Sequence, residues 1–297
     1  MSDDRLYHLH AEATKEFESG PKFNWVLRFD CAAQDLRNLE ITDVREDAAG
    51  WRSRVPPKNF YFTHAQFYTD GIQHIIDELL IKPTSNRALY SLISQEHIRK
   101  KGDAPIPSFM TFQCQIDNDA LYCTCYFRAL EISTFLKINL EEIRQTLVEI
   151  YEGVPRFSKV NLTIFAFHAY IDRTRSPLKR PQLESLYELD LASMLSEATH
   201  TPVRNLNGIL KELRNAGTVV SAEKLIDLKR ILSTNLPGIK IHPDLTKALF
   251  IEQLGVAIEA ATTLGELRCK ESRGPAVTAA TSVYQTAIDA MLNTLDT

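Results

Sequence analysis

Two strand-like runs that flank three turn-forming residues constrain the fold of this chain more than any other feature. Residues 108–116 and 121–128 are rich in aromatic, β-branched and sulfur-containing side chains, which favour the pleated surface of a sheet. Between them lie Asp117, Asn118 and Asp119, followed by Ala120, and Asn and Asp tolerate the backbone conformations of tight turns. The sequence therefore predicts a β-hairpin in the middle of the chain.

Regular apolar spacing on both sides of this hairpin predicts further elements. Residues 71–80 place Ile72, Ile75, Ile76, Leu79 and Leu80 on one helical face, and residues 140–150 also have helical spacing. The runs 25–29, 88–93 and 160–167 are typical of strands. Residues 1–57 show no other convincing periodicity. We therefore expect mixed α and β structure in this part of the chain.

The pattern changes after the basic, proline-containing segment Arg173–Pro181, where strand-like alternation stops. Helical spacing follows in residues 203–213, 222–232, 245–264 and 277–295. We predict an α+β fold with a domain at 1–178 and a helical C-terminal domain at 179–297.

Composition excludes several classes of protein. The formal net charge is −4 and the basic residues are scattered, so we expect no nucleic-acid partner. We see no apolar run of about 20 residues and no signal-like N-terminus, so we expect a cytoplasmic protein without a membrane segment. The five cysteines predict reduced thiols, and the spacing of Cys123 and Cys125 fits strand alternation better than a metal site.

Five short segments in a fixed order carry a resemblance to a known family. They are Pro83–Arg87, Pro107–Gln113, Leu121–Arg128, Asn139, and Phe167–Tyr170. In order and spacing they resemble the thymidylate synthase and deoxycytidylate hydroxymethylase superfamily, which has Pro-x-Ser-Arg-Arg, Pro-Cys-His, a strand ending in Tyr-x-Arg-Ser, Gly-x-Pro-x-Asn, and Asp-Ala-His-x-Tyr. The resemblance is confined to about 71–175 and implies a mixed sheet with packed helices.

The resemblance also implies roles for individual residues. Arg87 and Arg128 match phosphate-binding arginines, and the residue like Arg87 reaches across a homodimer interface in that family. Asn139 matches the asparagine whose amide reads the edge of a uracil ring. His168 and Tyr170 match the pair that hydrogen-bonds the sugar hydroxyl.

The departures from the family pattern concern its chemistry. Ser108 occupies the position of the nucleophilic cysteine, and a hydroxyl without a strong adjacent base supplies almost no nucleophile at neutral pH. Phe109 replaces the neighbouring histidine. Cys114 lies on the same strand face by alternation but roughly 20 Å away. Glu131 replaces the aspartate that contacts folate, so we expect no folate cofactor.

These matches and departures leave three functions open. The preferred prediction is an inactive protein like thymidylate synthase that binds a pyrimidine nucleoside monophosphate such as dUMP for sensing or regulation. A second is an active one-carbon transferase or hydroxymethylase with an altered nucleophile. A third is a structural dimer core whose residues 179–297 bind a protein partner. We expect Glu141 and Glu142 to be solvated charges without a role.

Overall fold

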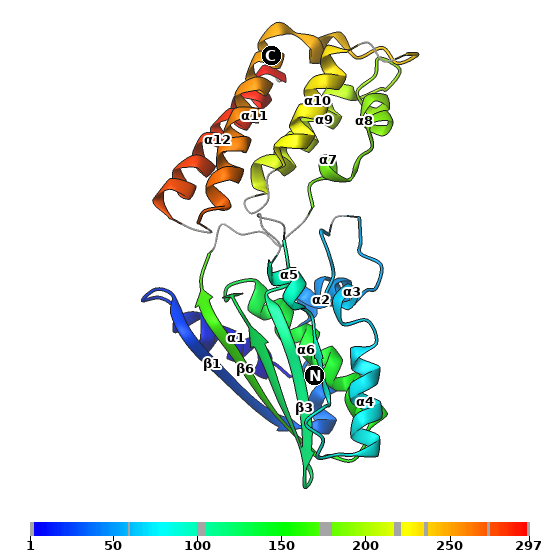
Figure 1. Cartoon of the computed structure of the whole chain (residues 1–297), viewed down its shortest axis with the longest axis vertical. Helices are drawn as coiled ribbons and strands as arrows, with labels where there is room; N and C mark the ends of the chain where they lie inside the picture. The colour runs from blue at the N-terminus through cyan, green and yellow to red at the C-terminus, as the bar shows by residue number, and fades with distance from the viewer. Residues whose placement is uncertain are drawn as a thin grey trace. The chain divides into compact units, whose positions relative to one another are not determined.

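The structure is a computed structural model that describes residues 3–58, 60–99, 105–172, 180–216, 221–234, 237–271 and 274–295. Its contacts divide the chain into two units (Figure 1). The first comprises residues 1–57, 62–100 and 106–177, and the second comprises 58–61, 101–105 and 178–297. The predicted boundary segment lies mostly outside the described residues.

A mixed sheet forms the centre of the first unit. In the described residues its strand order is β1 (Lys22–Ala32), β6 (Lys159–Tyr170), β4 (Ala120–Phe127), β3 (Phe109–Asp117) and β2 (Leu89–Ser91), with β5 (Leu130–Glu131) also pairing with β6. The pairing of β6 with β4 and β5 is parallel, and the other pairings are antiparallel. The predicted hairpin is confirmed, since Asp117 pairs with Ala120 and Asn118 has a φ of 54°. The α+β fold class is therefore confirmed.

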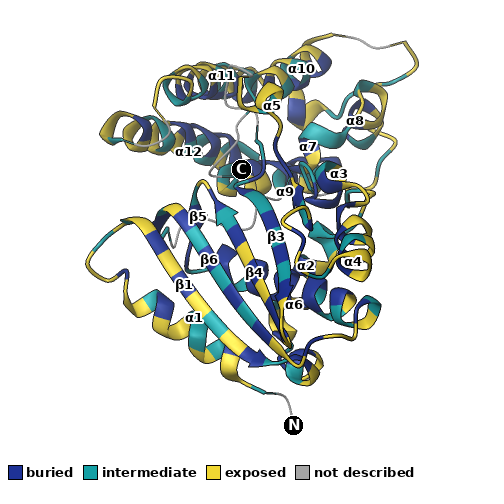
Figure 2. Ribbon diagram, turned by 60° about the horizontal axis from the view of Figure 1, so that its bottom comes forward, coloured by how far each residue is buried: buried dark blue, intermediate teal, exposed yellow. Residues whose placement is uncertain are grey.

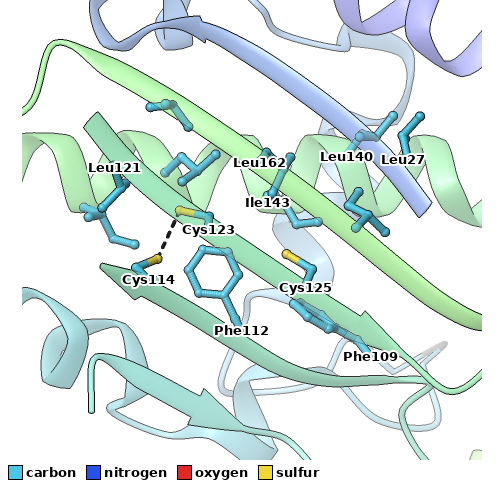
Figure 3. Close-up of a cluster of buried hydrophobic side chains, with 14 of the residues drawn as sticks. Leu27, Phe109, Phe112, Cys114, Leu121, Cys123, Cys125, Leu140, Ile143 and Leu162 are labelled. Atoms are coloured by element: carbon cyan, nitrogen blue, oxygen red, sulfur yellow. Dashed lines mark hydrogen bonds between the residues drawn. The ribbon is translucent and has the colours of Figure 1, made fainter. Parts of the chain in front are cut away.

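Helix α6 (Phe135–Gly153) connects β5 to β6 and packs its apolar residues against the sheet. Figure 3 shows Leu140 and Ile143 beneath the strands that carry Phe112, Cys123 and Cys125. The other helices of this unit are α1 (Arg5–Lys15), α2 (Arg45–Trp51), α3 (Ala65–Tyr68), α4 (Gly71–Ile81) and α5 (Gln95–Arg99), with 3-10 turns at Ala33–Arg37 and Thr42–Val44. Helix α4 confirms the predicted helix, although Leu80 is exposed.

The two faces of the sheet differ in exposure along each strand (Figure 2). On β6, Val160, Leu162, Ile164 and Ala166 are buried, as strand alternation requires for the face that meets α6. The alternate residues on the opposite face are partly or fully exposed, and Phe167 is 49% exposed. Within the described residues of the first unit, this second face of the sheet is therefore left open.

The second unit is helical, as the sequence predicted. Its described helices are α7 (Gln182–Ser185), α8 (Glu188–Met194), α9 (Pro202–Asn215), α10 (Ala222–Ser233), α11 (Ala248–Arg268) and α12 (Pro275–Leu295), with a 3-10 turn at Pro243–Thr246. Helix α11 has 21 residues and a mean hydropathy of 1.2, so by length and composition it could cross a membrane. Phe250, Leu254 and Leu264 of this helix are buried in the helical core, and 33% of its apolar window is buried.

One expectation for the first unit was wrong, and one region had no prediction beyond a single strand. Residues 1–57 also contain α1 and α2, which were not predicted because short helices with few buried residues give little periodic signal. Glu141 and Glu142 are 0% and 2% exposed rather than solvated. Both carboxylates have buried polar partners, which is how a folded chain offsets the cost of burying charge.

Candidate functional site

The topology of the sheet brings most of the predicted site residues to one edge. Arg128 directly follows β4, and His168 and Tyr170 lie at the end of β6, which runs parallel to β4. Ser108 directly precedes β3, which is antiparallel to β4, so it reaches the same edge. The backbone N–H of Arg128 donates to the Ser108 carbonyl at 3.0 Å. Asn139 lies near the start of α6.

Arg87 lies elsewhere within the chain. It is an exposed residue of the turn between α4 and β2, and Leu89 of β2 pairs with Gln113 of β3. Continuing this register places Arg87 about seven residues along β3 from Ser108, or roughly 20 Å at the rise of a strand. Arg87 therefore does not join the other predicted residues of its own chain.

The guanidinium group of Arg128 is partly engaged by the backbone. Its Nε donates to the carbonyl of Pro107 and its Nη2 to that of Ile106, both at 3.2 Å. Burial lowers the pKa of Arg128, while the nearby Tyr170 phenol acts in the opposite direction. An arginine has five N–H donors in a planar fork and remains charged at neutral pH. The described contacts use two of these donors, which leaves capacity for an anion.

The carboxamide of Asn139 is buried and incompletely paired. The residue is 3% exposed, and its Nδ2 donates to the Phe135 carbonyl at 2.7 Å. Its Oδ1 is buried and has no hydrogen-bond partner among the described residues. Leaving such an acceptor unpaired costs about 1–3 kcal/mol. A buried acceptor of this kind is a feature that a bound donor would satisfy.

His168 and Tyr170 lie against each other at the end of β6. Their ring centroids are 5.2 Å apart, and the His168 ring stacks on Phe23 at 4.8 Å. Tyr170 is 6% exposed and lies close enough to Arg128 for its phenol to oppose the lowering of the Arg128 pKa by burial. These contacts place Arg128, Tyr170 and His168 in one continuous group.

Ser108 lacks the surroundings of an activated nucleophile. Its hydroxyl makes no hydrogen bond within the described part of the chain, and the following Phe109 is 2% exposed and stacks on Phe127 at 4.7 Å. A register irregularity between Phe109 and Thr111 interrupts the alternation of β3. The expectation that Cys114 shares the face of Ser108 was therefore wrong. Cys114 packs instead against Cys123, with the two Sγ atoms 3.1 Å apart (Figure 3).

Glu131 has a structural role at the start of α6. Its carboxylate accepts hydrogen bonds from the backbone N–H groups of Ser133, Thr134, Phe135 and Asp172, and from the Ser133 hydroxyl. A carboxylate at a helix N-terminus satisfies donors that the helix itself cannot pair. Both carboxylate oxygens of Glu131 thus accept hydrogen bonds from the chain itself. This is the residue at the position of the folate-contacting aspartate in the pattern described above.

The sequence reasoning missed a buried His64–Glu142 pair near this edge. The imidazole Nδ1 of His64 lies 2.8 and 2.9 Å from the two carboxylate oxygens of Glu142. The ring of His64 also contacts Phe109, with centroids 5.6 Å apart. One signal was present: Glu142 is three residues from Asn139 and therefore shares its helical face. No periodic pattern pointed to His64.

Neither a search for metal ligands nor comparison with known proteins identifies further site residues. In the described ranges, no group of three or more His, Cys, Asp or Glu side chains could hold a metal ion. Compared with protein-family models and with curated proteins, the chain matches none of them.

Proposed function

We propose that the sheet edge formed by Arg128, Asn139, His168 and Tyr170 binds a pyrimidine nucleoside monophosphate such as dUMP, for sensing or regulation rather than catalysis. The observation that carries this proposal is the buried, unpartnered Oδ1 of Asn139 near the start of α6. The resemblance to thymidylate synthase supplies the ligand class, and the convergence of the matched residues supports it.

The chemistry of Asn139 suits a uracil edge. Its Oδ1 can accept from a ring N–H, and the second hydrogen of Nδ2 can donate to the adjacent carbonyl. The three remaining donors of Arg128 suit a phosphate, which favours planar arginine forks. His168 and Tyr170 would then contact the sugar between base and phosphate.

A homodimer belongs to this proposal, because Arg87 lies too far from Ser108 in its own chain to help bind the phosphate. The open face of the sheet supports self-association. It exposes Tyr122 and Phe167 at 51% and 49%, and the uncharged Gln115 and Thr124 lie beside Tyr122, although Asp117 and Lys159 on the same face are charged. Large exposed apolar side chains on one face are typical of an interaction surface. Sedimentation should show a dimer that Tyr122→Asp dissociates, and a monomeric wild-type protein would remove this part of the proposal.

The absence of catalysis rests on Ser108. No base is hydrogen-bonded to its hydroxyl within the described residues, and an unassisted serine is a poor nucleophile. We also propose a cytoplasmic location and a protein partner for the helical unit, whose Tyr187 and Leu189 are 80% and 68% exposed.

One observation favours a second function, a structural core without a ligand. Phe109 and Phe135 are 2% and 8% exposed, and Asn139 already donates to the Phe135 carbonyl. Aromatic side chains packed in this way could replace a nucleotide rather than admit one.

Calorimetric titration of the full chain with dUMP, dCMP and dTMP separates the two functions. Saturable heat with dUMP would support the nucleotide site. No heat with any of the three nucleotides would contradict it and favour the structural core.

A further inference from the structure

Strand β1 lies at one end of the sheet and pairs on one side only. Among the described residues its partner strand is β6, and Figure 2 shows β1 at the margin of the sheet. In an antiparallel pair, alternate residues direct their N–H and C=O groups toward the partner, so the remaining groups of β1 point to the open side. Such an edge is a template on which a further strand can pair.

The regular part of this edge is confined to residues 25–32. Asn24 has a φ of 54°, a left-handed conformation that interrupts the extended backbone of the strand. At the other end β1 stops at Ala32, and the N–H of Ala33 donates to the Ser158 carbonyl at 2.8 Å. Any strand that adds to this edge must therefore pair with the segment between these two points.

Two opposite charges lie on the regular edge. Arg28 and Asp30 are exposed, and they point to the same face because side chains alternate along a strand. Their cross-strand neighbours on β6 are the uncharged Thr163 and Asn161. Neither Arg28 nor Asp30 forms an ion pair in the described part of the chain. Charges of one sign on an edge would repel a second copy, whereas an arginine and an aspartate two residues apart can complement their own copies.

We propose that two copies of the chain pair antiparallel through β1, about a two-fold axis at Phe29, so that their sheets become one continuous sheet. In this register Arg28 of each copy lies opposite Asp30 of the other. Opposite charges directly across an antiparallel pair are stabilising and like charges are destabilising. An axis at residue 28 or at residue 30 would bring one of these charges opposite itself, so charge selects the axis at Phe29. The contact is symmetric and closes after two copies.

This surface goes beyond the proposed function and differs from the open sheet face. It uses the backbone edge of residues 26–32 and none of the proposed nucleotide-binding residues. One short strand pair is a small interface, and small interfaces are weak. Edge pairing therefore joins the proposed homodimers at high protein concentration, and it weakens as salt screens the exposed charges.

Sedimentation velocity of the full chain, over a range of protein concentrations and at low and high salt, tests this pairing. Wild-type protein should associate beyond the species present at low concentration. Arg28→Asp and Asp30→Arg each place like charges opposite one another and should weaken this step about tenfold. Lys211→Asp is the matched control, since it reverses the charge of an exposed residue of α9 and should leave the step unchanged. Tyr122→Asp should retain the step, which separates this surface from the open face.

An equal mixture of Arg28→Asp and Asp30→Arg gives the sharpest readout. One variant then carries only acidic side chains at these two positions and the other only basic ones, so a mixed pair has opposite charges at both contacts. The mixture should recover wild-type association, as should the double reversal alone. Mixing would not rescue variants whose fold was merely damaged. The proposal is overturned by wild-type protein that shows no concentration-dependent association, by single reversals that associate like wild type, or by a mixture that is not rescued.

Discussion

Replacing Glu131 with glutamine should destabilise the first unit, because this carboxylate holds the start of α6. Oε1 accepts from the backbone N–H groups of Ser133 and Asp172 at 2.8 and 3.1 Å. Oε2 accepts from those of Thr134 and Phe135 at 2.8 and 3.1 Å. A glutamine has one acceptor oxygen and places an NH₂ group where the other oxygen was. In either orientation, two backbone donors lose their partner.

The magnitude follows from those two donors. A hydrogen bond to a charged group contributes about 1.5–3 kcal/mol, and a negative charge at a helix N-terminus adds about 0.3–1 kcal/mol. Partial access of water to the Ser133 end reduces the loss. We therefore expect Glu131→Gln to lower the free energy of unfolding by about 3 kcal/mol, a large share of the total stability of a typical domain.

Urea denaturation followed by circular dichroism measures this loss. The matched control is Glu152→Gln, the same substitution at the other end of α6, where Glu152 forms an exposed ion pair with Arg37; it should cost less than about 0.5 kcal/mol. A loss below about 1 kcal/mol for Glu131→Gln, or equal losses for both variants, would refute the assignment of Glu131 as the helix cap.

Three further predictions concern Arg128, Glu141 and the cysteines. Arg128→Ala should weaken dUMP binding by roughly 1.5–3 kcal/mol, whereas Arg156→Ala, which removes another exposed arginine bonded to a backbone carbonyl, should leave it unchanged; equal calorimetric affinities would remove the phosphate role. Glu141→Gln should destabilise the fold by about 3 kcal/mol in urea because its arginine partner would remain buried without a counter-charge, and an unchanged midpoint would contradict this. At neutral pH a thiol reagent should label Cys269 rapidly and the buried thiols slowly, since burial raises the pKa of Cys31 to about 11; rapid labelling of several thiols in the native protein would be inconsistent with the structure.

Much of the fold could be predicted from local patterns in the sequence. The turn residues Asp117–Asp119 and the alternating runs around them predicted β3 and β4, because a tight turn between two strand-like runs has few alternatives. Apolar spacing predicted α6 and the four long helices of the second unit. Helix α1 was missed because its only buried residues are Leu6 and Ala13, too few to produce a clear periodic stripe.

The burial of charged residues in the first unit could not be predicted from the sequence. Glu141 and Glu142 are charged neighbours, and helical amphipathicity assigns such residues to solvent. Both are nevertheless buried, and part of their pairing comes from distant parts of the chain: the Ile41 backbone N–H donates to Glu141, and His64 pairs with Glu142. Such long-range pairing leaves no periodic trace. The hydrogen bonds from Arg128 to the carbonyls of Ile106 and Pro107 could not be predicted for the same reason, because they join residues about 20 positions apart.

The central claim is that Asn139 reads a pyrimidine base, and the most direct test is the ratio of dUMP to dCMP affinity in wild-type protein and in Asn139→Asp. An asparagine pairs with the donor and acceptor of uracil, whereas an aspartate offers acceptors that suit the amino group of cytosine. We predict that wild-type protein prefers dUMP and that the variant shifts the preference toward dCMP. The same ratio in both folded proteins would contradict the claim and place any bound base elsewhere.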